Sequence, residues 1–427
     1  MKSMSKKRII VGIELGSSKI AVIVGQVQID QVTLYKEVSI IGVSSAESQG
    51  IRKGQIVNIE EAVDATITGV EAAERMAGYN LDRAYLSIGG SHISSYNSHG
   101  VVAVSDSDGE ITEGDVERVI EAASAVSLPS SREIIHILPR EFIVDGETGV
   151  RDPVGMSGVR LEVQTHLVTA SSAAIKNLRK ALEEVGIQVE EFVFSGLASG
   201  EAVLTRTEKE LGCVLVDIGG GTTSIAVYIE GALSYSGEIP IGANNVTNDL
   251  AIGLRVSLDT AEKVKLSLSK MEKKSKKAKE KLDDQVDLKS LGVSDSRTIS
   301  QKTLKEGIIR PRLNEIFTMV KLQIDKDNLS VRVPSGVIVT GGGAGTVGVI
   351  ESAKRMMSLP VRIGNPKGVS GLIDDVINPS FATPVGLILY GARKESSESF
   401  KSITSKFKLP SKGILVKLIN TFKDLLP

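Results

Sequence analysis

Two stretches of largely apolar residues, about 200 positions apart, repeat one pattern along this chain. The first is IIVGIELGSSKIAVIVG (9–25) and the second is VLVDIGGGTTSIAVYIEGAL (214–233). Each contains a β-branched run, an acid, a glycine-rich turn with hydroxyls and a second β-branched run, which predicts a β-hairpin. Matching Ile20 with Ile225 gives the second turn two extra residues.

The composition of these two turns favours phosphate binding. Glycine lets backbone N–H groups approach an anion, and Ser or Thr hydroxyls add donors. Two such hairpins facing each other would hold a polyphosphate from both sides, and Glu14 and Asp217 would hold Mg²⁺ through water. A single hairpin of this kind is more often only a tight turn. The hypothesis of a nucleotide site therefore depends on the pair.

Helical periodicity appears between and after the hairpins. Apolar residues share one face in 59–77, and further helices are expected over 115–126, 172–186, 303–324 and 347–357. The segment EEFVFSGLASGEAVLT (190–205) also favours a helix. Residues 88–165 mix short strands with one helix, which is typical of a compact α+β insert. The chain as a whole therefore predicts an α/β protein with an inserted subdomain.

Composition restricts the function classes. A chain of 427 residues suits two to three domains, and its net charge of −1 gives no reason to expect nucleic acid. The one cysteine, Cys213, lies in an apolar strand pattern and is expected in the core, and the four histidines have no metal-ligand spacing. No uninterrupted apolar run reaches the roughly 18 residues of a spanning helix, so a cytoplasmic protein is expected. Seven lysines in 270–281, with acids interspersed, favour a solvated helix end or loop over a nucleic-acid patch.

Two further features fit a nucleotide. The strand Val337–Thr340 runs into Gly341, Gly342, Gly343 and Ala344, a corner at which a ring or ribose can lie against the backbone. IPIGANNVTNDLA (239–251) leads a strand into a helix, and Glu262 and Lys265 then share one helical face. That spacing is compatible with a surface ion pair alone or with contacts to ribose and adenine.

The end of the chain changes character. Residues 393–412 are mostly Ser, Lys and Glu and are expected to form a flexible linker. In the following GILVKLINTFKDLLP, the apolar residues fall within an arc of about 140° of a helix. Eight Lys or Arg against three acids from position 393 give this tail a positive charge. A terminal helix docked on the body is the alternative, but the polar linker favours an interfacial helix on anionic lipid. The apolar residues are Ile414, Leu415, Leu418, Ile419, Phe422, Leu425 and Leu426, flanked by Lys417 and Lys423.

The paired hairpins, GLASG, IPIGANN and VIVTGGGA occur in an order that resembles the actin/Hsp70/sugar-kinase superfamily. Within it the chain resembles the FtsA family of bacterial cell-division proteins, nearly end to end. The most specific stretches are SIGGSHISS, LPREFIVDGETGVRDPVGMSGVRLEV, FSGLASGEAVLT, ELGCVLVDIGGGTTSIAVY and GLILYGA. The 88–165 insert is typical of FtsA and separates it from Hsp70, actin and MreB.

This resemblance implies an actin-like (ribonuclease H-like) two-lobe fold that binds ATP and Mg²⁺ in a cleft, with an α+β insert and a C-terminal amphipathic helix. Many superfamily members have Asp at the position of Glu14, so at most weak ATPase activity is expected. The residues implied in cofactor binding are Gly16, Ser17, Ser18 and Lys19 in the first turn, Asp217, Gly219, Gly220, Gly221, Thr222 and Thr223 in the second, and Gly242, Asn245, Glu262, Lys265 and Gly341–Ala344 around the nucleoside.

The resemblance also implies a domain plan. It comprises a first lobe (1–87, 166–206 and 379–392), the insert (88–165), a second lobe (207–257 and 335–378), a small subdomain (258–334), the linker (393–412) and the membrane helix (413–427). The small subdomain would bind the C-terminal tail of FtsZ, with Arg310, Arg312 and Glu315 as candidate contacts. Self-assembly into filaments, later division proteins and a place at the division septum, on the cytoplasmic face of the plasma membrane, are further expectations.

Three other functions remain open at this point. A kinase or phosphatase of the same superfamily would need a catalytic carboxylate between the lobes, and the sequence indicates no convincing one. An Hsp70-like chaperone is disfavoured because only about 35 residues follow the nucleotide fold. A type IV pilus assembly ATP-binding protein would share the architecture, but no lipid-binding tail is expected in that class.

Overall fold

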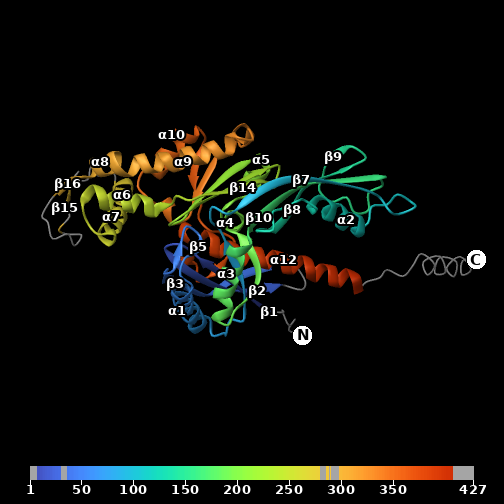
Figure 1. Ribbon diagram of the computed structural model, residues 1–427, viewed down its shortest axis with the longest axis horizontal. Coiled ribbons are helices and arrows are strands. Elements are labelled where there is room, and N and C mark those ends of the chain that lie inside the picture. Colours follow the sequence, from blue (N-terminus) through green and yellow to red (C-terminus); the bar gives the residue numbers. More distant parts are fainter. Residues whose placement is uncertain (1–6, 30–35, 279–284, 288, 290–297, 407–427) are drawn as a thin grey trace, which may run out of the picture.

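The computed structural model describes residues 7–29, 36–278, 285–287, 289 and 298–406. Two large sheets form the centre of the molecule (Figure 1). The four-stranded sheet of the insert and the helical small subdomain lie at opposite ends of the longest axis. In this view the second lobe and the insert both lie above the first lobe.

The first lobe is built on a six-stranded sheet in the order β11-β6-β1-β2-β3-β19. Helix α1 packs on one face, where Gly69 lies against Ile20 and Val22, and α12 packs on the other. The elements are β1 (Lys7–Leu15), β2 (Lys19–Ile29), β3 (Lys36–Glu47), β4 (Ile51–Arg52), β5 (Gln55–Ile56), α1 (Ile59–Ala77), β6 (Arg83–Ile88), α3 (Ser172–Glu184), β11 (Gln188–Phe194), α4 (Ser195–Val203), β19 (Ser370–Gly371), α11 (Ile373–Val376), η5 (Pro379–Phe381) and α12 (Ala382–Lys406).

The insert is an antiparallel sheet in the order β7-β10-β8-β9 with one covering helix, α2. A capping box at Thr112 and Asp115 starts that helix. The elements are β7 (Ser94–Ala103), α2 (Glu113–Ser124), β8 (Arg132–Val144), β9 (Glu147–Val150) and β10 (Arg160–Ser171). Since β10 pairs with β7 and β8 as far as Thr169 and Ser171, the insert extends beyond the predicted boundary at 165.

The second lobe has a five-stranded sheet in the order β14-β13-β12-β17-β18 and carries the small subdomain. Cys213 is fully buried in β12, as predicted. The elements are α5 (Arg206–Leu211), β12 (Cys213–Ile218), β13 (Thr223–Ile229), β14 (Ala232–Ile239), α6 (Ala243–Leu254), α7 (Leu258–Ala278), β15 (Gln285–Asp287), β16 (Thr298–Ser300), α8 (Gln301–Leu304), η2 (Lys305–Ile309), α9 (Arg310–Asp325), η3 (Leu329–Arg332), β17 (Val337–Thr340), η4 (Gly342–Gly345), α10 (Val349–Met357) and β18 (Val361–Ile363).

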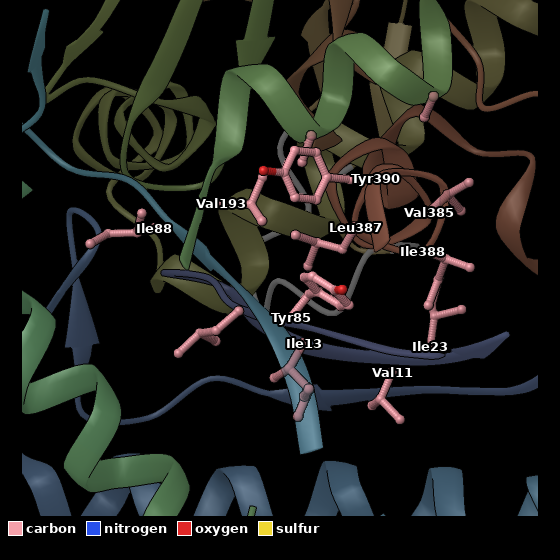
Figure 2. Packing of buried hydrophobic residues seen from close by; sticks show 14 of the residues in the cluster. Val11, Ile13, Ile23, Tyr85, Ile88, Val193, Val385, Leu387, Ile388 and Tyr390 are labelled. Carbon is pink, nitrogen blue, oxygen red and sulfur yellow. The ribbon is translucent and has the colours of Figure 1, made fainter. Parts of the chain in front are cut away.

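Helix α12 packs unusually close to its neighbours because glycines face it. A Cβ on Gly12 would lie 2.9 Å from Cβ of Leu387, and a Cβ on Gly386 would overlap the carbonyl oxygen of Ala198 in α4. Figure 2 shows Leu387 and Ile388 of α12 among the buried side chains of β1, β2 and β6. This packing places the first turn of α12 next to the hairpins.

Three sequence-based expectations about elements are wrong. Residues 190–194 belong to strand β11, and the helix starts only at Ser195, because the buried FVF run joins the sheet beside β6. Ser370 and Gly371 pair with β3, so the chain returns to the first lobe before 379. Helix α12 continues to Lys406 through most of the expected flexible linker, and residues 407–412 lie outside the described residues.

Candidate functional site

Both glycine-rich turns close hairpins in the same way. In the first, Leu15 pairs with Ile20 and the Gly16 N–H donates to the carbonyl of Lys19 at 3.1 Å. In the second, Ile218 pairs with Thr223 and the Gly219 N–H donates to Thr222 at 2.9 Å. The two turns therefore have equal length, and the prediction of two extra residues in the second turn is wrong. Thr223, and not Ile225, is the counterpart of Ile20.

The two turns face each other across a cleft, one from each lobe. A Cβ on Gly220 would lie 2.9 Å from Cβ of Ser18, and one on Gly221 would lie 2.7 Å from the Ser17 hydroxyl, so only glycine allows this approach. The cleft encloses about 830 Å³ of empty space, including solvent at its mouth. The sequence-predicted residues that line it are Glu14, Gly16, Ser17, Ser18, Lys19, Asp217, Gly219, Gly220, Gly221, Thr222, Gly341 and Gly342.

Asp217 is buried near the end of β12. Two helices that cross behind the cleft, α4 and α12, hold its side chain. Its Oδ2 accepts hydrogen bonds from the hydroxyl of Ser199 in α4 and, at 3.1 Å, from that of Thr383 in α12. The two hydroxyls also contact each other at 2.9 Å. Burial raises the pKa of Asp217, and these hydrogen bonds act in the opposite direction. The carboxylate therefore has a fixed orientation.

Lys19 is the cation of the cleft. Its Nζ lies 3.4 Å from the Ser380 hydroxyl and 3.5 Å from the ring centroid of Phe381, both just before α12. Burial lowers the pKa of Lys19, while Glu14 and Asp217 raise it. An ammonium with a hydroxyl and an aromatic ring as its neighbours can bind an anion that enters the cleft.

The carboxylates suit a hydrated divalent cation. Burial raises the pKa of Glu14 to about 7, and Asp217 adds to this rise while Lys19 opposes it. Two carboxyl groups that disfavour each other's charge in a poorly solvated cleft would be stabilised by a cation between them. No cluster of three or more acidic, His or Cys ligands exists within the described part of the chain. The residues present therefore fit Mg²⁺ held by water and phosphate oxygens better than an all-protein metal site.

Other predicted residues lie behind the cleft. Thr223 is buried and donates to the carbonyl of Ile241 at 2.8 Å, so it supports the second turn. Gly242 lies beneath that turn, where Ala243 N–H donates to the Gly219 carbonyl at 2.9 Å. The residues that do not line the cleft are Thr223, Gly242, Asn245, Glu262, Lys265, Gly343 and Ala344.

Glu262 and Lys265 form a local cluster between α6 and α7. The buried Lys265 ammonium lies 2.7 Å from Glu262 and 2.8 Å from the Thr247 hydroxyl, which itself contacts Glu262 at 2.5 Å. This arrangement joins the two helices. The proposed contacts of these residues with ribose and adenine stay a prediction.

Several residues that line the cleft were not predicted from the sequence. The tight β4–β5 hairpin brings Gly54 to the first turn, where its N–H donates to the Ser17 hydroxyl at 3.2 Å. Glu238 of β14 also lines the cleft, a carboxylate between the lobes that the sequence did not indicate. Lys53 and Gly54 form the two-residue turn of this hairpin, both with positive φ, and the glycine is the sequence signal that could have indicated it. No local signal distinguishes Glu238 from an ordinary polar strand position.

The candidate FtsZ contacts have partners within the chain. Arg312 of α9 holds Asp249 of α6 with two hydrogen bonds of 2.7 and 3.0 Å and also pairs with Glu315. Arg310 pairs with Glu306. Their role in binding a partner stays a prediction. The lysine-rich run lies on α7 as far as Ala278, and the membrane-helix residues 414–426 lie outside the described residues.

Comparison with known proteins decides the family. One family model, described as the SHS2 domain inserted in FtsA, matches residues 90–169, and another, cell division protein FtsA, matches 214–386. The FtsA of Pseudomonas aeruginosa is 38% identical over 404 residues, covering 95% of this chain and 94% of the relative. This chain belongs to the FtsA family. The FtsA of Escherichia coli is 35% identical and covers 99% of both chains.

Solved structures agree on the architecture of this FtsA-family chain. A structure titled PilM-PilN type IV pilus biogenesis complex has a TM-score of 0.60 at 15% identity and covers 90% of this chain and 98% of the other. MreB5 of Spiroplasma citri bound to ADP has a TM-score of 0.51 at 15% identity and covers 93% and 98%. The fold is therefore actin-like, as expected, and family membership decides against the pilus-assembly, kinase and chaperone alternatives. In the described residues, no helix is both long and apolar enough to cross a membrane.

Proposed function

We propose that this chain is an ATP-binding scaffold that tethers FtsZ to the cytoplasmic face of the plasma membrane at the division septum. The observation that carries the nucleotide part is the cleft in which two glycine turns, Lys19 and two carboxylates converge. The turn amides and Lys19 would bind the phosphates, and Glu14 and Asp217 would hold Mg²⁺ through water. Bound Mg²⁺ would neutralise phosphate charge.

Closure of the two lobes on ATP would favour a form that assembles into filaments. The Ser199 and Thr383 hydroxyls, which hold Asp217, belong to the two helices that cross behind the cleft. A change at the phosphates would therefore reach α12, whose last described residue is only eight positions before Ile414. One short amphipathic helix binds lipid weakly, and several in one filament gain avidity. FtsZ and later division proteins would then be recruited to the assembled form.

Co-sedimentation with anionic liposomes tests the proposal. The full chain is expected to pellet with vesicles and to bring purified FtsZ with it, and this is expected to increase with ATP. A chain ending at Ser411 keeps the described residues and is expected to stay in the supernatant. A matched full-length variant, Phe422→Glu, removes one apolar contact of the tail. Equal pelleting of all three proteins would reject the membrane assignment.

A further inference from the structure

Glu238 lies where the two lobes meet. It is the next-to-last residue of β14, with Ser224 of β13 as its Cα partner. Its side chain reaches the first lobe, because a Cβ on Gly89 would lie 3.0 Å from each of its carboxylate oxygens. Glu238 and Thr222, from the second turn, line the same cleft. A carboxylate is thus present beside the turn expected to hold phosphates.

This carboxylate is not fully satisfied by the protein. Its Oε2 is buried and accepts no hydrogen bond from the described residues. Burial raises the pKa of Glu238 to about 7, against the opposing effects of the Thr222 hydroxyl and the Gly90 N–H, while Asp217 raises it further. A buried acceptor without a partner is costly, and such groups are often retained for function.

The other two carboxylates of the cleft are already engaged. Asp217 accepts hydrogen bonds from Ser199 and Thr383, and Glu14 lies under the electrostatic influence of Lys19. The residues that line the cleft include no His or Cys. Burial raises the pKa of Glu14 to about 7 as well, so the unpartnered oxygen is what distinguishes Glu238: its buried Oε2 accepts no hydrogen bond from the described residues.

On the basis of the ATP-binding function proposed above, we propose that Glu238 orients and deprotonates the water that attacks the terminal phosphoryl group of bound ATP. The water oxygen forms a bond to the γ-phosphorus, and the bond between that phosphorus and the β–γ bridging oxygen breaks. The bridging oxygen leaves on ADP with the electron pair, and the water proton passes to the Glu238 carboxylate. Lys19 offsets the negative charge of the phosphates. The proton is then lost to solvent with inorganic phosphate.

The experiment separates binding from hydrolysis in the full chain. Glu238→Gln keeps the size of the side chain and cannot take up a proton. We expect hydrolysis to fall by about 100-fold or more. ATP affinity, measured with a fluorescent analogue, should change by less than about threefold. The variant should also retain intact ATP after incubation, as measured by chromatography of the bound nucleotide. Glu238→Asp, which keeps a carboxylate, should recover part of the rate. Glu190→Gln, on an exposed strand position, is the matched control.

Each outcome decides a different point. Hydrolysis by Glu238→Gln within threefold of the unaltered chain would overturn the inference. Loss of both affinity and hydrolysis would assign Glu238 a structural role and overturn it as well. An unaltered chain that binds ATP without hydrolysing it would also overturn the inference but leave the proposed function standing. Absence of ATP binding in the unaltered chain would instead reject the proposed function itself.

Discussion

Replacement of Gly386 by alanine tests the close crossing of α4 and α12 behind the cleft. The new Cβ would overlap the carbonyl oxygen of Ala198 and lie 3.1 Å from its Cα, whereas carbon atoms prefer roughly 3.5–4.0 Å. The helices must therefore separate by on the order of 1 Å. Overpacking of this kind costs about 1–3 kcal/mol or more. Alanine recovers up to about 1 kcal/mol of helix propensity, because Gly386 lies inside a helix.

The net cost, about 2 kcal/mol, should lower the melting temperature of this 427-residue chain by roughly 2 °C. ATP binding should also weaken, because Ser199 and Thr383, which lie next to this crossing, orient Asp217. We expect Gly386→Ala to weaken ATP binding by about tenfold, as measured by calorimetric titration and thermal melting. Gly114→Ala on α2 is the control, since its Cβ would meet only the Thr112 hydroxyl at 3.7 Å. Unchanged melting and affinity in Gly386→Ala would refute the argument from close packing.

Four further substitutions have defined outcomes. Asp217→Ala and Gly342→Asp should each abolish ATP binding by titration, and a folded Gly342→Asp is expected because only Cβ of Ser380, at 3.9 Å, lies near the new Cβ. Asp115→Asn should lower the melting temperature at pH 7. Hydrogen bonds from Thr112 and Ser105 hold the pKa of Asp115 well below its usual 3.8. The ionised side chain therefore stabilises the fold above pH 3.8, and this stabilisation is lost as the pH falls through the pKa of the folded state. If Asp115→Asn lowered the melting temperature equally at pH 7 and at strongly acid pH, this explanation would be contradicted. Arg312→Ala should destabilise the α6–α9 contact by about 1–2 kcal/mol in urea unfolding, since it frees Asp249. Retention of FtsZ binding by that variant would remove Arg312 from the partner surface.

The hairpins could be predicted from sequence because each is local. Alternation and the glycine turns lie within 25 residues of one another, and the amphipathic pattern of α1 is equally local. Comparison of residue types alone misaligned the second turn. Ile225 resembles Ile20, but the backbone pairing shows that Thr223 is the residue that corresponds to Ile20. Hydrogen-bond register, and not residue type, determines which positions correspond.

The remaining site residues required the tertiary fold. Ser199 and Thr383 meet only because α4 and α12 cross behind the cleft, and Glu238 reaches the same cleft from a third segment, β14. The linker was misjudged for another reason. Its Lys and Glu residues are good helix formers, and no Gly or Pro interrupts 393–406 after the apolar helix begins, so the helix continues.

The length of α12 has a mechanical consequence. Tyr390 and Lys394 are attached to Glu191, and Arg393 to Glu201, so this part of the helix moves with the first lobe. The helix from Lys394 to Lys406, twelve steps of about 1.5 Å, extends about 18 Å farther as a stiff arm. A random-coil tether would let the body rotate freely above a surface. If the tail binds a membrane as proposed, a stiff arm would restrict the height and tilt of the body, and neighbouring molecules would then approach one another already aligned.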